Sequence, residues 1–285
     1  MRRAVLLSLL AIFVAAGCKP GAEMVKFPTR PKRYRTVASL SPGSTEIVQS
    51  LAFNVTLVGR TAACDFPPQV KSVPIIAQVK PDYEKLKSLN PDLVVYDASL
   101  YSDQDVAQIK GLGMDVFEFR ANTIEGLAEE VRKFGTLIGR ELEASDFIDK
   151  VLQERKAGIA AGPKPAPKVA VIMASTGGEH YIAGVNSFQA DLVRAGGAEP
   201  AGPEADRFVP VNAETLIKMN PDMVITAGKP DSFFNDPRFK TLKAISTGNV
   251  RGIDQNLMVR KGFRVQKAIN LTGNAINNMA PGAKS

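Results

Sequence analysis

A twelve-residue phrase occurs twice in this chain, and the repeat constrains the fold more than any other feature. The first copy is EKLKSLNPDLVV, from Glu84 to Val95, and the second is ETLIKMNPDMVI, from Glu214 to Ile225. The copies align without a gap. Each has a short amphipathic stretch, an Asn-Pro-Asp stop and an apolar, β-branched ending. The repeat therefore predicts two halves on one plan, each with a short helix followed by a buried strand.

Helix capping explains most of the matched residues. Asp82 and Asn212 each stand two residues before the glutamate and can cap a helix. Asn90 and Asn220 can take the left-handed conformation that ends a helix, and the proline after each prevents continuation. Each copy is therefore expected to be a helix, a stop and a strand.

The chain from Thr36 onward alternates strand and helix patterns, which is typical of α/β units with a mainly parallel sheet. Ser41 is a plausible N-cap and Pro42 the first residue of the helix that follows. The expected strands are 36–40, 55–60, 92–97, 115–120 and 168–173, and the expected helices include 41–52, 102–113 and 186–198.

Residues 123–161 have apolar residues at helical spacing, which predicts a long helix interrupted near Gly135 or Gly139, if at all. The predicted architecture is thus two Rossmann-like α/β lobes, 35–122 and 163–285, joined by a long rigid helix at 123–162. The ligand site is expected in the cleft between the lobes, facing the strand ends.

The N-terminus has the pattern of a bacterial lipoprotein signal. Residues 1–17 combine two arginines, an apolar run and small residues before Cys18, and AAGC is similar to a lipobox. The alternative is an ordinary cleavage site beside an incidental cysteine. Residues 18–34 form a basic, proline-containing tether, which suits anionic headgroups near a lipid anchor.

Charge and residue types argue against several functions. The formal net charge is +7, but much of the basic excess lies in the leader and tether, so nothing indicates a nucleic-acid partner. The chain has one histidine and two cysteines, and if Cys18 carries lipid, Cys64 has no intramolecular partner. Nucleotide-binding and nucleophile-elbow motifs are missing. With one histidine and one free cysteine, most acid–base and nucleophilic schemes also lack a partner residue.

Several segments resemble one known family, the substrate-binding lipoproteins of bacterial ABC importers for vitamin B12, haem and iron–siderophore complexes. The segments are SLSPGSTE (39–46), CDFPPQVKSVPII (64–76), both NPD phrases, FKTLKAISTGNV (239–250) and RKGFRV (260–265). The resemblance runs from Arg35 to Asn278, and the layout is most similar to the cobalamin branch. It implies a class III bilobal fold without enzymatic activity or a resident cofactor. It also implies a monomer, lipid-anchored at the periplasmic or extracellular face of a membrane.

The resemblance gives the two glutamates of the repeat a role. In that family one glutamate per lobe pairs with arginines of the permease dimer, which works with an ATPase, and the matching positions are Glu84 and Glu214. The residues alone leave another interpretation open. A glutamate in the first helical turn is favoured by the helix dipole by about 0.3–1 kcal/mol, and Glu214 can pair with Lys218 one turn later.

Ligand contacts are also implied by the resemblance. Tyr181 and Phe208 match pocket aromatics, and Phe66 is placed on a loop near the cleft, although its ring can instead pack beneath that loop. Arg207, Arg260 and Arg264 can meet phosphate or carboxylate groups, or can be solvated or capping residues.

Some positions depart from the family pattern. The chain has no tryptophan, and Gln78 stands where the cobalamin branch often has a large ring. His180 is expected at the cleft mouth beside Tyr181, where it is either a hydrogen-bonded residue or an axial contact to a ligand metal. Cys64 is expected to be a small buried thiol. No metal-binding spacing occurs.

The resulting prediction is a protein that captures a corrinoid (cobalamin-like) or related metal-chelate ligand and delivers it to a membrane permease. The alternatives are a haem or ferric-siderophore binding protein of the same fold, or a ligand sensor without a transport role.

Overall fold

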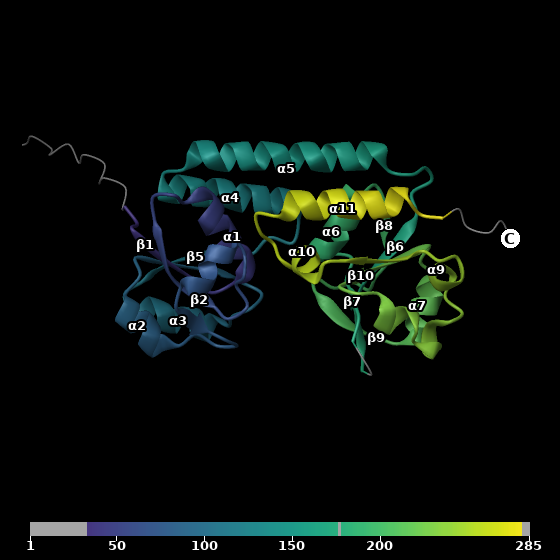
Figure 1. The fold of residues 1–285 in the computed structure, drawn as a ribbon, viewed down its shortest axis with the longest axis horizontal. Coiled ribbons are helices and arrows are strands. Elements are labelled where there is room, and N and C mark those ends of the chain that lie inside the picture. The colour runs from purple at the N-terminus through teal and green to yellow at the C-terminus, as the bar shows by residue number, and fades with distance from the viewer. Residues whose placement is uncertain (1–32, 176–177, 281–285) are drawn as a thin grey trace, which may run out of the picture. The chain divides into compact units, whose positions relative to one another are not determined.

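The computed structural model describes residues 33–175 and 178–280 (Figure 1). The predicted signal peptide, lipidation site and nearly all of the tether lie outside the described residues. From Tyr34 onward the chain forms one compact unit. Among the described residues, none of the helices combines the length and the apolarity that a membrane span requires.

The first half contains a five-stranded sheet in which every neighbouring pair is parallel. Its order is β3 (Ile75–Ala77), β2 (Thr56–Thr61), β1 (Thr36–Ser39), β4 (Leu93–Asp97) and β5 (Asp115–Phe119). The helices of this half are α1 (Pro42–Leu51), α2 (Tyr83–Leu89) and α3 (Asp103–Gly111), with a 3₁₀ turn, η1, at Pro68–Ser72. The strand residues of β1 and β4 are largely buried, as expected of a parallel sheet covered on both faces.

Helix α1 begins where the sequence predicts. The Ser41 hydroxyl accepts a hydrogen bond from the Ser44 amide, and Pro42 occupies the first helical position. The proline costs no hydrogen bond there, because the first amides of a helix have no intrahelical partner.

The second half contains a mixed sheet. Its path is β11 (Val250–Ile253), β10 (Met223–Ala227), β6 (Lys168–Met173), β7 (His180–Ala183) and β9 (Phe208–Val211), and β8 (Glu199–Pro200) also pairs with β6. The helices are α6 (Phe188–Ala195), α7 (Ala213–Met219), α8 (Asp231–Phe234), η2 (Pro237–Phe239), α9 (Lys243–Ser246), α10 (Gln255–Val259) and α11 (Val265–Asn277).

The second sheet departs from the parallel plan at β7. This strand is antiparallel to both β6 and β9. The connection from β6 to β7 is too short for the crossover that a parallel pair needs, so the chain turns back directly. The two halves therefore share the repeated element but not the whole sheet topology.

The repeated phrase forms the same structure in both halves, which confirms that prediction. Asp82 accepts from the amide of Lys85 at the start of α2, and Asn212 accepts from the amide of Thr215 at the start of α7. Asn90 and Asn220 end the two helices at φ values of 43° and 47°. Strands β4 and β10 follow.

The interval predicted as a linking helix contains two helices, α4 (Ile124–Ile138) and α5 (Glu141–Ala161). They separate at Gly139, which has a φ of 67° and ends α4 in the left-handed conformation. In Figure 1, α5 lies along the length of the compact unit, with α4 and α11 between it and the two sheets. Helix α5 contacts both α4 and α11, so it is the element that joins the halves.

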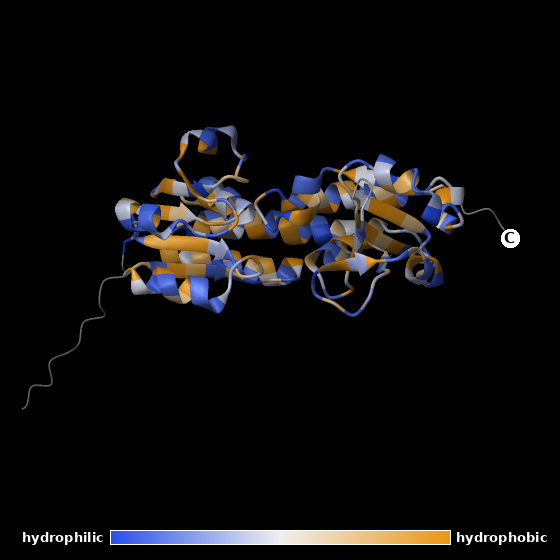
Figure 2. Cartoon of the chain, turned by 90° about the horizontal axis from the view of Figure 1, so that it is seen from below, coloured by the Kyte–Doolittle hydropathy of each residue, from blue (hydrophilic) through white to orange (hydrophobic). Residues whose placement is uncertain are grey.

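One continuous apolar core lies beneath these helices. It includes β1 and β4 of the first sheet, β6 and β10 of the second, and the buried faces of α4, α5 and α11. Phe147 of α5 stacks on Phe263 at 4.9 Å between ring centroids. Two smaller clusters lie farther out, one in each half. Figure 2 shows the mainly apolar strands between more polar helices. A shared core of this kind restricts movement between the halves.

Candidate functional site

A cavity of about 460 Å³ lies between loops of the two halves. The first half contributes the start of α1 and the segments that follow β2, β4 and β5. The second half contributes the start of α6, the approach to β9, and α10 with the residues after it. The lining residues are Ser41, Pro42, Gly43, Ala63, Asp97, Ser99, Leu100, Asn122, Phe188, Gln189, Asp206, Arg207, Phe208, Asn256, Val259, Arg260 and Lys261. The cavity thus lies at the carboxyl ends of parallel strands, where open α/β sheets bind ligands.

Three of the sequence-predicted candidates line this cavity: Arg207, Phe208 and Arg260. Phe208 is half-buried and offers an apolar face. Arg207 is exposed, and its guanidinium lies 3.6 Å from the carboxylate of the neighbouring Asp206. A cavity with an aromatic wall and a few polar groups is suited to a flat ligand with charged or amide substituents.

Phe66 and Arg264 face each other instead. The guanidinium carbon of Arg264 lies 4.3 Å from the centre of the Phe66 ring, in a cation–π contact. Neither residue is among those that line the cavity. The Phe66 ring therefore packs against a side chain of the second half.

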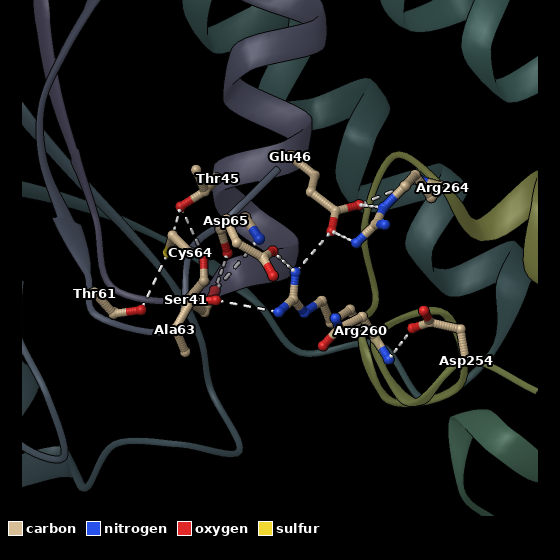
Figure 3. A network of polar contacts seen from close by, with 12 residues as sticks. Ser41, Thr45, Glu46, Thr61, Ala63, Cys64, Asp65, Asp254, Arg260 and Arg264 are labelled. Carbon is tan, nitrogen blue, oxygen red and sulfur yellow. Dashed lines mark hydrogen bonds and ion pairs between the residues drawn. The ribbon is translucent and has the colours of Figure 1, made fainter. Parts of the chain in front are cut away.

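Arg264 also forms a bidentate pair with Glu46, as Figure 3 shows. Its Nε donates to Glu46 Oε2 at 3.1 Å and its Nη2 donates to Glu46 Oε1 at 2.7 Å. The Glu46 side chain is only 1% exposed. Glu46 belongs to α1 of the first half, whereas Arg264 immediately precedes α11. This pair therefore fixes the RKGFRV segment against the first half.

Arg260 belongs to the same network (Figure 3) and also lines the cavity. Its Nη1 donates to Asp65 Oδ1 at 2.5 Å and lies 3.5 Å from Glu46 Oε1, and its Nη2 donates to the Ala63 carbonyl at 3.1 Å. The hydrogen bond from Arg260 lowers the pKa of Asp65. We call Glu46, Asp65, Arg260 and Arg264 the inter-half charge network.

A second ion pair joins the two halves in the wall of the cavity. Lys261 Nζ donates to Asp97 Oδ1 at 2.9 Å, and both side chains are largely buried. The backbones come close here, since a Cβ on Gly43 would lie 2.6 Å from the Lys261 carbonyl oxygen. Only glycine permits this approach. Arg260 and Lys261 thus line the cavity while their charges are satisfied by acids of the first half.

His180 lies away from the cavity, which corrects the expected position at the cleft mouth. Its side chain is 1% exposed, and its ring packs edge-on against Phe233 at 5.4 Å between centroids. Nδ1 accepts from the Ser175 amide, and Nε2 lies 3.1 Å from Asp236 Oδ2. Both nitrogens are engaged, so the ring is a hydrogen-bonded core residue with no nitrogen directed at a ligand metal.

The remaining candidates take other positions. Tyr181 lies in β7, opposite Pro210 of β9 and Met173 of β6, and is not a lining residue. Gln78 is exposed outside the cavity. Cys64 is a buried thiol, as expected, with its sulfur 3.1 Å from the Thr45 and Thr61 hydroxyls. In the part of the chain that the structure describes, no three His, Cys, Asp or Glu side chains are grouped for a metal ion.

Glu84 and Glu214 are both exposed, each at the second position of its helix. Helices α2 and α7 lie on the side of the compact unit opposite α5 (Figure 1). Lys218 donates to Glu214 at 2.7 Å, but both side chains are more than 70% exposed. An exposed pair of this kind is easily exchanged for another partner.

Most other cavity residues were not selected from the sequence, among them Asp97, Asn122, Phe188, Gln189 and Lys261. For two of them a signal was present. Asp97 ends a predicted strand and Asn122 follows another, so both occupy the strand ends where the cleft was expected. Phe188 and Gln189 begin α6 inside a predicted helix, where the cavity-facing side was not evident.

Two α/β halves around a cavity at their strand ends define a two-lobed ligand-binding protein. Residues 37–257 match the family model described as periplasmic binding protein. The match covers most of the chain, and the chain belongs to this family.

Individual relatives agree with this assignment. One is YvrC of Bacillus subtilis (strain 168), an ABC transporter substrate-binding lipoprotein that is 25% identical over 85% of this chain and 79% of its own length. Another is the high-affinity haem uptake system protein IsdE of Staphylococcus aureus (strain Newman), 24% identical over 87% of each chain. The solved apo structure of the periplasmic haem-binding protein RhuT from Roseiflexus sp. RS-1 superposes with a TM-score of 0.75 at 21% identity, over 87% of this chain and all of that one. The predicted class III fold is confirmed.

Proposed function

We propose that this chain is the substrate-binding component of an ABC importer, and that it captures a metal-chelate ligand in the cavity between its halves. The observation that carries the proposal is the cavity itself, which combines the ring of Phe208 with residues from strand ends of both halves. Family membership supports a binding role, and the name of the relative YvrC supports an importer.

The chemistry of the lining favours a ligand whose metal is already fully coordinated. Haem iron in proteins is held by histidine, cysteine, methionine or tyrosine. None of these types occurs among the described residues that line the cavity. A corrinoid with its own axial groups, or a ferric siderophore, needs no such residue. Of these two ligands we propose the corrinoid, because the sequence resembles the cobalamin branch.

Haem is the second candidate, because IsdE and RhuT are named for haem. The two candidates differ in what they require of the protein. A haem ligand would need either an axial residue brought in from beyond the lining or an iron held only by exogenous groups.

Mixing the purified full chain with cyanocobalamin, haemin or a ferric siderophore tests the proposal, since all three are coloured. After removal of free ligand, we expect the corrinoid to remain with the protein at one molecule per chain, with Phe208→Ala weakening its affinity by roughly tenfold or more. Binding of haemin with a Soret shift typical of a new axial ligand, and no retention of the corrinoid, would identify haem instead. Retention of none of the three would contradict the proposal.

Delivery is proposed to use Glu84 and Glu214. Their equivalent helices are exposed on one side, as a permease dimer with two equivalent subunits requires. In this proposal the chain acts as a monomer, held at the membrane by lipid on Cys18, and the permease with its ATPase performs the transport. A sensor without transport would need the cavity but not both acids.

A further inference from the structure

A smaller cavity of about 260 Å³ adjoins the main one. Four residues line both: Ser99, Asn122, Asp206 and Arg207. The smaller cavity, which we call the side cavity, adds Ala98 and Arg120. The two cavities therefore adjoin, and one edge of a ligand in the main cavity would lie next to the side cavity.

The side cavity brings together one arginine from each half. Arg120 follows β5 at the carboxyl edge of the first sheet, and Arg207 immediately precedes β9 of the second. Two guanidinium groups and one carboxylate, that of Asp206, line the side cavity, and Glu118, which pairs with Arg120, is not among the lining residues. The lining itself therefore presents more positive than negative groups to a ligand.

The two arginines of the side cavity differ from Arg260 and Lys261 of the main cavity. Arg260 and Lys261 are largely buried and are held by Asp65, Glu46 and Asp97. Arg207, by contrast, is 79% exposed and lies 3.6 Å from Asp206.

Arg120 makes a paired contact with Glu118, at 2.8 Å and 3.1 Å, but its side chain is 66% exposed. Exposed pairs contribute little to stability, so both guanidinium groups can turn to a ligand at small cost.

We propose that the side cavity is an anion subsite, which binds a carboxylate or phosphate group at the edge of the ligand between Arg207 and Arg120. Guanidinium groups suit both anions because their donors form a planar fork. The Asn122 amide lies in the same lining as a further donor. Since each half supplies one arginine, a bound anion also connects the halves. The inference rests on the proposed function in one respect, that the anion belongs to the captured chelate.

Citrate and inorganic phosphate test the subsite without any chelate. We expect millimolar citrate or phosphate to raise the thermal unfolding midpoint of the full chain by roughly 2–4 °C, because a ligand that binds only the folded state stabilises it. Arg207→Gln should abolish the rise and Arg120→Gln should reduce it. Asp206→Asn should enlarge it, since the opposing carboxylate is removed. Comparing the two anions distinguishes a carboxylate from a phosphate subsite.

The matched control is Arg132→Gln, which removes the same charge from an exposed ion pair with Glu129 on α4. It should leave the rise unchanged. No rise with either anion in the wild-type chain, or an equal rise in wild type and Arg207→Gln, would overturn the subsite.

A chelate experiment separates this inference from the proposed function. For a corrinoid with a phosphate, or haemin with free carboxylates, Arg207→Gln should weaken binding by about tenfold or more. The affinity for cobinamide or for the haem dimethyl ester should be the same in wild type and Arg207→Gln. A citrate response without retention of any chelate would contradict the proposed function and support the subsite. A chelate held equally by wild type and Arg207→Gln would overturn the subsite alone.

Discussion

At the scale of single residues, Glu46 is a buried side chain that joins the two halves. It is buried, and it accepts both hydrogen bonds of the Arg264 fork while lying 3.5 Å from Arg260. A buried carboxylate is tolerated only when it is paired and hydrogen-bonded. Glu46 meets this condition through Arg260 and Arg264, which belong to the second half, so the condition is met only where the two halves pack together.

Glu46→Gln should therefore destabilise the protein strongly. Removing one partner of a buried pair leaves the other charge uncompensated, and because Arg264 retains some solvent access we expect a loss of about 2–4 kcal/mol. Urea unfolding followed by circular dichroism measures it. Glu129→Gln on α4 is the matched control, since its partners Arg132 and Lys133 are exposed and the expected loss is under about 1 kcal/mol. Equal, small losses in the two variants would show that the network is not a stabilising contact.

At the scale of elements, the features that could be predicted from the sequence are those determined by local interactions. The caps at Asp82 and Asn212, the stops at Asn90 and Asn220, and the start of α1 each depend on a few neighbouring residues. For the same reason a break in the linking helix could be expected near Gly135 or Gly139, and the structure has it at Gly139.

Features that depend on distant residues could not be predicted. The pairing of Glu46 with Arg264 joins positions 218 residues apart. The burial of His180 against Asp236 and Phe233 likewise joins residues more than fifty positions apart. Consequently the cleft was predicted, but only Arg207, Phe208 and Arg260 of the named candidates line it.

Helix α3 carries a pH-dependent contact that orients α2, the helix that contains Glu84. Asp105 accepts from the Ser102 hydroxyl at 2.6 Å and from the Tyr83 hydroxyl at 2.8 Å. These bonds, with Ser102 first, lower the pKa of Asp105 to about 2. Tyr83 directly precedes Glu84, so this contact joins α2 to α3.

Because the pKa of Asp105 is lower in the folded state, its contribution to stability should be present above about pH 4 and lost as the pH falls toward 2. A carboxyl NMR titration should show the low midpoint. Tyr83→Phe should raise the midpoint, while Tyr34→Phe, which removes a hydroxyl bonded to Asp115, should not. A wild-type midpoint near the ordinary aspartate value would contradict the assigned contact.

At the scale of the whole molecule, the shared core and the repeated element have a joint consequence. The core beneath α5 and α11 continues from the first sheet to the second, and the inter-half charge network and the Lys261–Asp97 pair add polar contacts across the cavity. Movement between the halves should therefore be small. Glu84 and Glu214 then keep a nearly constant separation, whether or not a ligand is bound.

Charge reversal at both acids tests this arrangement as a docking surface. Glu84→Lys with Glu214→Lys should abolish uptake in cells, because each lysine meets the basic partner that its glutamate would have paired with. The affinity of the purified variant for its ligand should be unchanged, since neither residue lines the cavity. Each single reversal should leave partial uptake.

The control is Glu129→Lys with Asp149→Lys, which changes the charge by the same amount on α4 and α5, away from the proposed docking side. Its uptake should match wild type. Two outcomes distinguish the interpretations of the repeat. Loss of uptake in the docking variant alone makes the two glutamates a matched pair of contacts. Normal uptake in both variants would reduce them to residues that favour the start of a helix, with about 0.3–1 kcal/mol each from the helix dipole.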